Sequence, residues 1–346
     1  MELGLSMFGD LHIDPITGIR QSGEQRLAEL IEEIKLADEI KLDVLGIGEH
    51  HREEYAISSP EIVLAAVATV TKQIKLSSSV TVLGSSDPVK LYQNFALVDL
   101  ISNGRSELMA GRGSFTESFP LFGYDLSDYN ALFEEKLDLF LQINSKERIN
   151  WNGQFRAPLQ NQKIFPRAVN NKIPVWIAAG GTRESAIRAG RLGIPIVFAV
   201  IAGTPLLHFQ PLYELYREVY EKSGHDMDQF QVGMFSHGLF GEDSKTVSDY
   251  YYPLYAAQMD RIGRTRGWSS FHRNQYDFGR SKEGAMFVGD AEETIDKILY
   301  AHELYGITRF FTHMDVGAPS HLHLMKSIEI LGTKIAPKIR EVLHKK

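Results

Sequence analysis

Glu49, His50 and His51 are the side chains in this sequence whose types and spacing most clearly suggest chemistry. They follow an apolar run at residues 42–47 that is typical of a buried strand. In α/β proteins reactive groups lie where a strand meets its loop, and imidazole titrates near neutral pH. We therefore interpret His50 and His51 as acid–base residues, with Glu49 orienting His50. The alternative is a helix cap beside a structural histidine.

Most of the other predicted strands also end in polar or small residues, and the third strand carries Ser79 and Val80 within it. These residues are Asp10, Ser79, Val80, Arg112, Gly180, Gly181, Thr182, His237, His313 and Asp315. Because parallel strands end on one rim, we expect these residues to surround a shared ligand site.

Two of these positions suit a phosphate group. Gly180, Gly181 and Thr182 open a predicted helix, where free backbone N–H groups and the positive helix end attract an anion. Arg112 lies between two glycines after the fourth strand and can make a two-pronged contact to that anion. Together these features favour phosphate binding. The alternative is a tight turn, with Arg112 paired to a surface acid.

A metal-dependent phosphoester hydrolase is the rival interpretation of the polar residues. Its ligands would be Asp10, His12, Glu49, His50, His51, Asp290, His321 and His323. However, Asp290 stands where a helix N-cap is expected, and His321 and His323 lie two positions apart in a predicted helix. Residues so spaced do not share a helix face, so we predict no metal site.

Eight strand-and-helix units must position these residues. The predicted strands are residues 3–8, 43–48, 74–83, 107–110, 175–179, 194–201, 230–240 and 309–313. The predicted helices are residues 24–40, 132–143, 183–191, 206–222, 244–259, 292–304 and 321–342, with two more beginning at Pro60 and Pro88. Strict alternation implies parallel strands with crossover helices, and eight such strands close a (β/α)8 TIM barrel.

The predicted α/β barrel carries insertions in two places. Residues 113–131 and 150–171 follow strand 4, and residues 261–286 precede strand 8. A doubly wound open sheet is the rival fold, but the first strand-to-helix turn lacks the glycine-rich dinucleotide pattern. No linker composition interrupts the chain, so we predict a single domain over residues 1–346.

The composition narrows the class of protein. A formal net charge of −7 argues against a nucleic-acid partner, which requires a concentrated basic face. The absence of cysteine excludes disulfides, thiolate metal sites and cysteine nucleophiles. No apolar stretch is long enough to span a membrane and no signal peptide is visible, so we expect a cytoplasmic protein without a membrane partner.

Several strings, in order and spacing, give the chain a family resemblance. They are Gly48-Glu49-His50-His51, residues 77–83, Asp87-Pro88-Val89, Ser102-Asn103-Gly104-Arg105, residues 111–115, Phe122-Gly123, residues 178–182 and Phe287-Val288-Gly289. On these strings the chain resembles the bacterial luciferase-like, flavin-dependent monooxygenases over most of its length.

The resemblance implies a TIM barrel that binds FMN at the C-terminal ends of its strands. His50 matches the histidine required for catalysis in the luciferases, and His51 matches its neighbour. Ser79 and Val80 match a non-prolyl cis peptide beneath the flavin ring.

The resemblance also assigns the phosphate site. Arg112 matches an arginine that contacts the FMN phosphate. The residues Gly180, Gly181 and Thr182 fall where the luciferases hold that phosphate partly through backbone groups.

The chain departs from the family pattern at two of these positions. Asn130 stands in place of a second phosphate arginine, and Gly111 replaces the reactive cysteine of the luciferases. The mobile loop of the luciferases would correspond to residues 261–286, where the sequences do not match. Light emission is therefore not implied, and a deazaflavin remains possible in place of FMN.

We predict a flavin-dependent oxidoreductase, specifically a monooxygenase that uses reduced FMN and O2 on a small organic substrate. A partner flavin reductase would supply the reduced FMN, and the resemblance implies a homodimer. Two alternatives stay open at this stage: a flavin-binding carrier without oxygenation, and the metal-dependent hydrolase.

Overall fold

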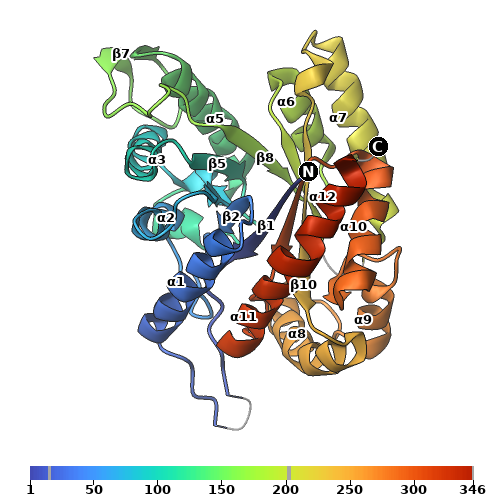
Figure 1. Cartoon of the computed structure of the whole chain (residues 1–346). Coiled ribbons are helices and arrows are strands. Elements are labelled where there is room, and N and C mark those ends of the chain that lie inside the picture. The colour runs from blue at the N-terminus through green and yellow to red at the C-terminus, as the bar shows by residue number, and fades with distance from the viewer. Residues whose placement is uncertain (15–16, 201–203, 345–346) are drawn as a thin grey trace.

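The computed structural model describes residues 1–14, 17–200 and 204–344, and its centre is a closed barrel of eight parallel strands (Figure 1). The barrel strands are β1 (Glu2–Met7), β2 (Val44–Ile47), β3 (Lys75–Ser78), β5 (Ser106–Gly111), β8 (Val175–Ala179), β9 (Ile196–Val200), β10 (Val232–Phe240) and β12 (Arg309–His313). Each strand pairs with the next, and β12 pairs with β1 to close the ring. The predicted TIM barrel is confirmed.

Helices connect the strands and surround the barrel (Figure 1). They are α1 (Gly23–Glu39), α2 (Pro60–Ala68), α3 (Pro88–Ser102), α5 (Tyr129–Ser145), α6 (Arg183–Leu192), α7 (Gln210–Lys222), α8 (Ser244–Arg266), α10 (Ala291–Tyr305), α11 (His321–Ile330) and α12 (Ala336–His344). Two short helices, α4 (Ser118–Leu121) and α9 (Arg273–Arg280), lie in the insertions. A π-helical turn (Leu331–Ile335) joins α11 to α12, so the last predicted helix is observed as one run.

Local capping explains where several helices begin. The Asp87 carboxylate accepts a hydrogen bond from the Lys90 N–H, and Pro88 occupies the first helical position of α3. Asp290 caps α10 in the same way by accepting from the Glu293 N–H, as the sequence predicts. Ser59 precedes α2, but its hydroxyl makes no capping bond.

The third strand differs from its prediction. One continuous strand was expected over residues 74–83, but β3 ends at Ser78 and pairing with β5 resumes in β4 (Thr81–Val82). The peptide bond between Ser79 and Val80, which lies in this gap, is cis. An apolar, β-rich run predicted the strand but not its interruption, and only the family resemblance implied the cis peptide.

The insertion predicted at residues 261–286 is helical over about half its length, at the end of α8 and in α9. α8 continues to Arg266, and its final turn buries Gly263 beneath Trp268. The helix ends at Gly267, whose φ of 70° lies in the left-handed region that favours glycine. A further strand, β11 (Phe287–Gly289), adds to the outer edge of β10. The basic residues hid this helical pattern in the sequence.

The insertion at residues 150–171 contains a two-stranded antiparallel hairpin that the sequence did not reveal. Its strands are β6 (Arg148–Trp151) and β7 (Leu159–Lys163). Most side chains of β7 are exposed, so the hairpin lacks the apolar pattern by which strands are predicted.

The N-terminal end of the barrel is closed by a buried ion-pair cluster. Arg309 on β12 donates to Glu107 at 2.6 and 3.2 Å and to Glu2 at 2.6 Å. Its guanidinium also lies 4.2 Å from the centroid of the Trp176 ring. Because this end is filled, any ligand of the barrel must bind at the opposite, C-terminal end.

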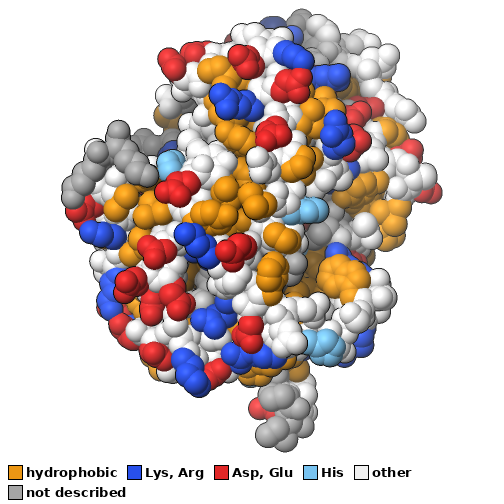
Figure 2. All heavy atoms as spheres, turned by 90° about the vertical axis from the view of Figure 1, so that its right-hand side faces the viewer, with side chains coloured by type: hydrophobic (Ala, Val, Ile, Leu, Met, Phe, Trp, Pro, Cys, Tyr) orange, Lys and Arg blue, Asp and Glu red, His pale blue; other side chains and the backbone are white. Residues whose placement is uncertain are grey.

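The length and hydropathy of the helices, and the distribution of surface charge, relate to the predictions about membrane and nucleic-acid partners. None of the described helices is long and apolar enough to cross a membrane. On the face shown in Figure 2, Lys and Arg side chains lie among acidic and apolar ones rather than in a continuous basic patch.

The predicted sixth strand ends at Ile201, which lies outside the described residues.

Candidate active site

A cavity of about 400 Å³ lies at the C-terminal ends of the barrel strands. Its apolar lining residues are Phe8, Val80, Val82, Met109, Phe115, Phe235, Met259, Ile262 and Val316, and its polar ones include Asp10, Glu49, His50, Ser79, Arg112, His237, Gln258, Arg266 and His313. Among the predicted site residues, His50, Ser79, Val80, Arg112 and Gly180 line this cavity. The remaining three, His51, Gly181 and Thr182, are bonded or adjacent to residues that do.

Arg112 forms one end of the site, just beyond β5. It donates to the Thr182 hydroxyl and to the Asn130 side-chain oxygen, both at 2.7 Å, and lies 5.6 Å from the Tyr129 ring centroid. No ion pair joins it to an acidic side chain among the described residues, so the surface-acid alternative is not observed. A cation held by neutral groups is available to an anionic ligand.

The start of α6 faces the same place. Thr182 is the N-cap residue, but its hydroxyl makes no capping bond to the helix and instead contacts Arg112 and Ser185. The first N–H groups of an α-helix have no partner within the helix, so they remain free to bind an anion. A Cβ atom placed on Gly180 or Gly181 would meet nothing within 4 Å, which shows open space above both. These residues therefore fit the phosphate of a flavin nucleotide.

Gly111 explains why the chain departs from the luciferase cysteine. A Cβ atom at this position would lie 2.4 Å from a methyl carbon of Val80, closer than any real contact. Residue 111 must therefore be glycine while Val80 keeps its place in the cavity wall.

His50 is enclosed by aromatic rings. Its ring centroid lies 4.2 Å from that of Tyr55, 4.8 Å from Phe115 and 5.0 Å from Phe8. Burial, followed by the nearby charges of His313 and Arg52, lowers the pKa of His50 to about 3. The imidazole is therefore neutral at physiological pH, and the expectation that it titrates near neutrality does not hold in this environment.

Glu49 orients His51 rather than His50, which corrects the predicted pairing. His51 Nε2 lies 2.9 Å from one Glu49 oxygen, and the other oxygen accepts from the Val82 N–H at 2.8 Å. The Phe122 ring packs edge-on against His51. His51 and Glu49 therefore brace the segment that contains Ser79 and Val80, and Glu49 also lines the cavity.

Two further histidines reach the cavity from β10 and β12. His237 and His313 are direct partners in the parallel register, and their ring centroids lie 5.2 Å apart. His237 Nδ1 lies 2.8 Å from the Tyr255 hydroxyl, and burial holds the pKa of His237 well below its usual range. Position at a strand end pointed to both histidines, but nothing in the sequence distinguished them from structural ones.

His313 belongs to a buried polar cluster with Asp10 and Asp315. His313 Nε2 lies 3.0 Å from Asp315 Oδ1, and the three side chains each place one possible ligand atom within 4.8 Å of the others. The other residues of the metal constellation lie apart: His12 is exposed, Asp290 caps α10, and His323 stacks on Tyr250 at 3.6 Å. The hydrolase constellation is therefore not assembled.

The mouth of the cavity is formed by the two insertions. Arg266 at the end of α8 donates to the Ser114 carbonyl at 2.7 Å, and its guanidinium lies 4.7 Å from the Phe115 ring centroid. Trp268 also contacts the cation, with its ring centroid at 5.2 Å. The insertions thus narrow the entrance with aromatic and cationic groups.

Several solved structures share this fold. The monooxygenase RslO1 from Streptomyces bottropensis aligns with a TM-score of 0.84 at 21% identity, covering 98% of this chain and 99% of that one. The FMN-bound oxygenating constituent of 3,6-diketocamphane monooxygenase from Pseudomonas putida aligns at 0.76 and 20% identity, covering 98% and 99%. The coenzyme F420-dependent tetrahydromethanopterin reductase of Methanopyrus kandleri aligns at 0.72 and 17% identity, again covering 98% and 99%.

Sequence comparison leads to the family. The alkanal monooxygenase alpha chain of Photorhabdus laumondii is 23% identical over 282 residues, covering 78% of this chain and 75% of the relative. The model of the luciferase-like monooxygenase family matches residues 1–308. The protein is therefore an enzyme that belongs to the luciferase-like monooxygenase family.

Proposed function

We propose that this enzyme is a monooxygenase that uses reduced FMN and O2 to oxidise a small organic substrate. The observation that carries the proposal is the anion site of Arg112 and the α6 N-terminus, which opens onto a largely apolar cavity. A flavin nucleotide has this same division, with a charged phosphate at one end and a flat apolar ring at the other. Apolar walls also keep water from a reactive oxygen species.

The proposed cofactor site divides among six residues. Arg112, Gly180, Gly181 and Thr182 would hold the phosphate, while Ser79 and Val80 would lie beneath the ring. Support for FMN over a deazaflavin comes from the FMN-bound structural neighbour, although another neighbour uses coenzyme F420. A deazaflavin therefore remains the alternative cofactor.

The catalytic assignment keeps His50 and gives His51 a supporting part. Reduced flavin, when bound, supplies the two electrons with which one oxygen atom enters the substrate and the other leaves as water. His50 faces the cavity as a neutral imidazole and would hydrogen-bond the reacting groups. His51 would act through Glu49, which holds the Val82 N–H next to Ser79 and Val80.

The decisive experiment has two steps. Titrating purified protein with FMN and separately with F420, by absorbance and flavin fluorescence, should show tighter binding of FMN. Reduced FMN and O2 with n-decanal as a probe should then yield an oxidised product in native protein. Replacement His50→Ala should lower this turnover by roughly 100-fold, the range for loss of a group that assists proton transfer. Undiminished turnover in His50→Ala, with intact FMN binding, would remove His50 from the mechanism.

A homodimer is part of the proposal, as is a partner flavin reductase. The neighbouring helices α2 and α3 expose Ile62, Leu97, Leu100 and Ile101, each at 46% or more of its surface. An exposed apolar patch of this kind marks an interaction surface. Light scattering after gel filtration should give twice the chain mass, and Leu97→Glu should give monomers. A cytoplasmic location and a single domain over residues 1–346 remain predictions.

A further inference from the structure

The three histidines that line the cavity differ in what lies beside them. Burial is the main cause that lowers the pKa of both His50 and His237, and neither ring lies within ion-pair distance of a carboxylate among the described residues. His313 alone faces one, because its Nε2 lies 3.0 Å from Asp315 Oδ1. The two atoms are within ion-pair distance but are not aligned for a hydrogen bond, so Asp315 acts on His313 through its charge, which stabilises a protonated imidazole.

Asp315 is built to stay ionised. It accepts hydrogen bonds from the N–H groups of Phe8 at 3.0 Å, Gly9 at 2.7 Å and Asp10 at 3.3 Å. Burial alone would raise the pKa of Asp315, but its contact with His313 and the charge of Arg26 lower it to about 2. A fixed negative charge therefore stands below the cavity and beside His313.

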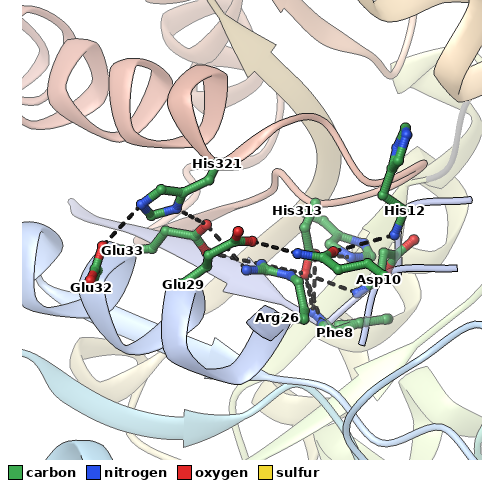
Figure 3. Close-up of polar contacts among 12 residues, drawn as sticks. Phe8, Asp10, His12, Arg26, Glu29, Glu32, Glu33, His313 and His321 are labelled. Carbon is green, nitrogen blue, oxygen red and sulfur yellow. Dashed lines mark hydrogen bonds and ion pairs between the residues drawn. The ribbon is translucent and has the colours of Figure 1, made fainter. Parts of the chain in front are cut away.

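A chain of ion pairs connects Asp315 to the surface through Arg26, Glu33 and His321. Figure 3 shows the outer part of this chain, from Arg26 to His321 and Glu32. Arg26 on α1 lies 3.4 Å from Asp315 and donates to Glu33 at 2.9 and 3.1 Å. Glu33 in turn meets His321 at 2.9 Å, which also contacts the exposed Glu32 at 3.2 Å. The single positive charge of Arg26 lies beside two buried carboxylates, Glu33 and Asp315. The resulting excess of negative charge favours binding of an additional proton in this cluster.

Asp10 closes the remaining side of the cluster. Its Oδ2 accepts from the Gly317 N–H at 3.2 Å, while its Oδ1 is buried and has no partner among the described residues. Burial and then the charge of Asp315 raise the pKa of Asp10 well above its usual range. The groups facing His313 are therefore Asp10, Asp315, His50, His237 and, through Asp315, Arg26.

We propose that His313, which lies beside the Asp315 carboxylate, supplies the proton that the cavity reaction consumes. This inference rests on the proposed flavin-dependent function. The monoanion of reduced flavin carries two electrons and one hydrogen to O2, so one further proton is needed. The products are then oxidised flavin with hydrogen peroxide, or oxidised flavin with oxygenated substrate and water. Asp315 and Arg26 are positioning residues in this scheme.

A divalent cation at Asp10, His313 and Asp315 fits the same cluster less well. The oxygens of Asp315 already accept three backbone N–H groups, and the Arg26 guanidinium at 3.4 Å would repel a second cation. Stoichiometric metal in purified protein that is lost in Asp10→Asn would overturn the proton assignment.

The first arm of the test separates this inference from the proposed function. Native protein, H313Q, D315N and the exposed control H12Q are titrated with oxidised FMN by fluorescence. We expect all four to bind FMN with dissociation constants within about threefold of one another, because His313 and Asp315 lie outside the phosphate site. Failure of native protein to bind FMN would reject the proposed function alone.

The second arm measures the proton itself. Bound reduced FMN is mixed with O2 without organic substrate, and its reoxidation is followed between pH 5.5 and 9. H313Q should be slowed at least about tenfold with a flattened pH profile, while H12Q should match native protein. In ligand-free protein labelled at histidine Cε1, the NMR signal absent from H313Q should lose its protonated form at lower pH in D315N than in native protein. A pH profile of H313Q that matches native protein, or a signal unaffected by D315N, would overturn the proposal.

Discussion

Both ends of this barrel contain buried charged groups, but the two ends treat them differently. At the N-terminal end all three guanidinium nitrogens of Arg309 donate to Glu107 or Glu2. At the C-terminal end both ring nitrogens of His313 and one oxygen of Asp10 are buried without a well-aligned hydrogen bond among the described residues. The charged and polar groups are buried at both ends, but the Arg309 guanidinium is fully hydrogen-bonded, whereas His313 and Asp10 are not.

The difference separates stability from function. A buried polar atom without a partner costs free energy, and use of that atom by a ligand or a reaction is one reason why a folded protein retains it. The paired end of the barrel closes the structure, whereas the unpaired end lies beneath the cavity. The comparison predicts that substitutions at the first end change folding, and substitutions at the second change ligand binding or pH dependence.

The largest effect is expected from Arg309→Met. The substitution keeps the apolar stem over Trp176 but leaves Glu107 buried beside Lys75 alone, whose Nζ is 3.5 Å away. Loss of one partner from a buried pair costs about 3–5 kcal/mol in the free energy of unfolding. Urea denaturation followed by circular dichroism measures this loss.

The matched control for Arg309→Met also removes the Glu107 carboxylate, which that substitution leaves without its main partner. The double variant Arg309→Met with Glu107→Met should recover most of the lost stability, because no unpaired charge remains. FMN affinity of the folded protein should stay within about twofold of native in both variants. A stability of Arg309→Met equal to that of native protein would show that the N-terminal cluster is not structural.

Arg112→Ala should weaken FMN binding while leaving the stability of the fold nearly unchanged, the reverse of Arg309→Met. It removes a cation that contacts only neutral partners, so unfolding stability should change little. Loss of a charge-assisted contact to phosphate should raise the FMN dissociation constant more than tenfold, about 1.4 kcal/mol or more. Fluorescence titration with FMN and, as a control, with riboflavin checks this. Riboflavin lacks the phosphate, so equal weakening of both ligands would contradict the phosphate assignment.

The sequence predicted the barrel well because its signals were local. Apolar strands, Pro88 after the capping Asp87, and strict alternation each follow from nearby residues. The helical turn at residues 261–266 was missed because its basic side chains hide a pattern that depends on packing of Gly263 against Trp268.

The candidate site could be predicted only in part for a related reason. Strand-end position brought His50 and Arg112 to the rim, and both line the cavity. The partner of Glu49 and the surroundings of His313 depend on contacts between distant segments, such as Asp315 with Phe8. Neither spacing nor composition encodes which imidazole meets a carboxylate.

Asp10→Asn should change how the stability of the protein depends on pH, because Asp10 belongs to the incompletely paired C-terminal end. The folded state holds the Asp10 proton to higher pH than the unfolded state, because its pKa is raised. Native stability therefore falls as pH rises above the ordinary aspartate pKa, by about 1.4 kcal/mol per pH unit until the folded carboxyl ionises. Asparagine is neutral throughout, so in urea denaturation the stability of the variant relative to native protein should increase as the pH rises above the ordinary aspartate pKa. A difference that is constant with pH would contradict this assignment.

The smallest effect is expected from Thr182→Val. It removes the hydroxyl that accepts from Arg112 at 2.7 Å, while Asn130 still holds the guanidinium at the same distance. Loss of one hydrogen bond to a charged group that keeps its other partner should weaken FMN binding about two- to fivefold. Because the hydroxyl acts through Arg112, the same substitution in an Arg112→Ala background should have no further effect on the dissociation constant. Additive losses in the double variant would mean that Thr182 binds the phosphate by itself, and that the C-terminal site has two independent anion contacts rather than one.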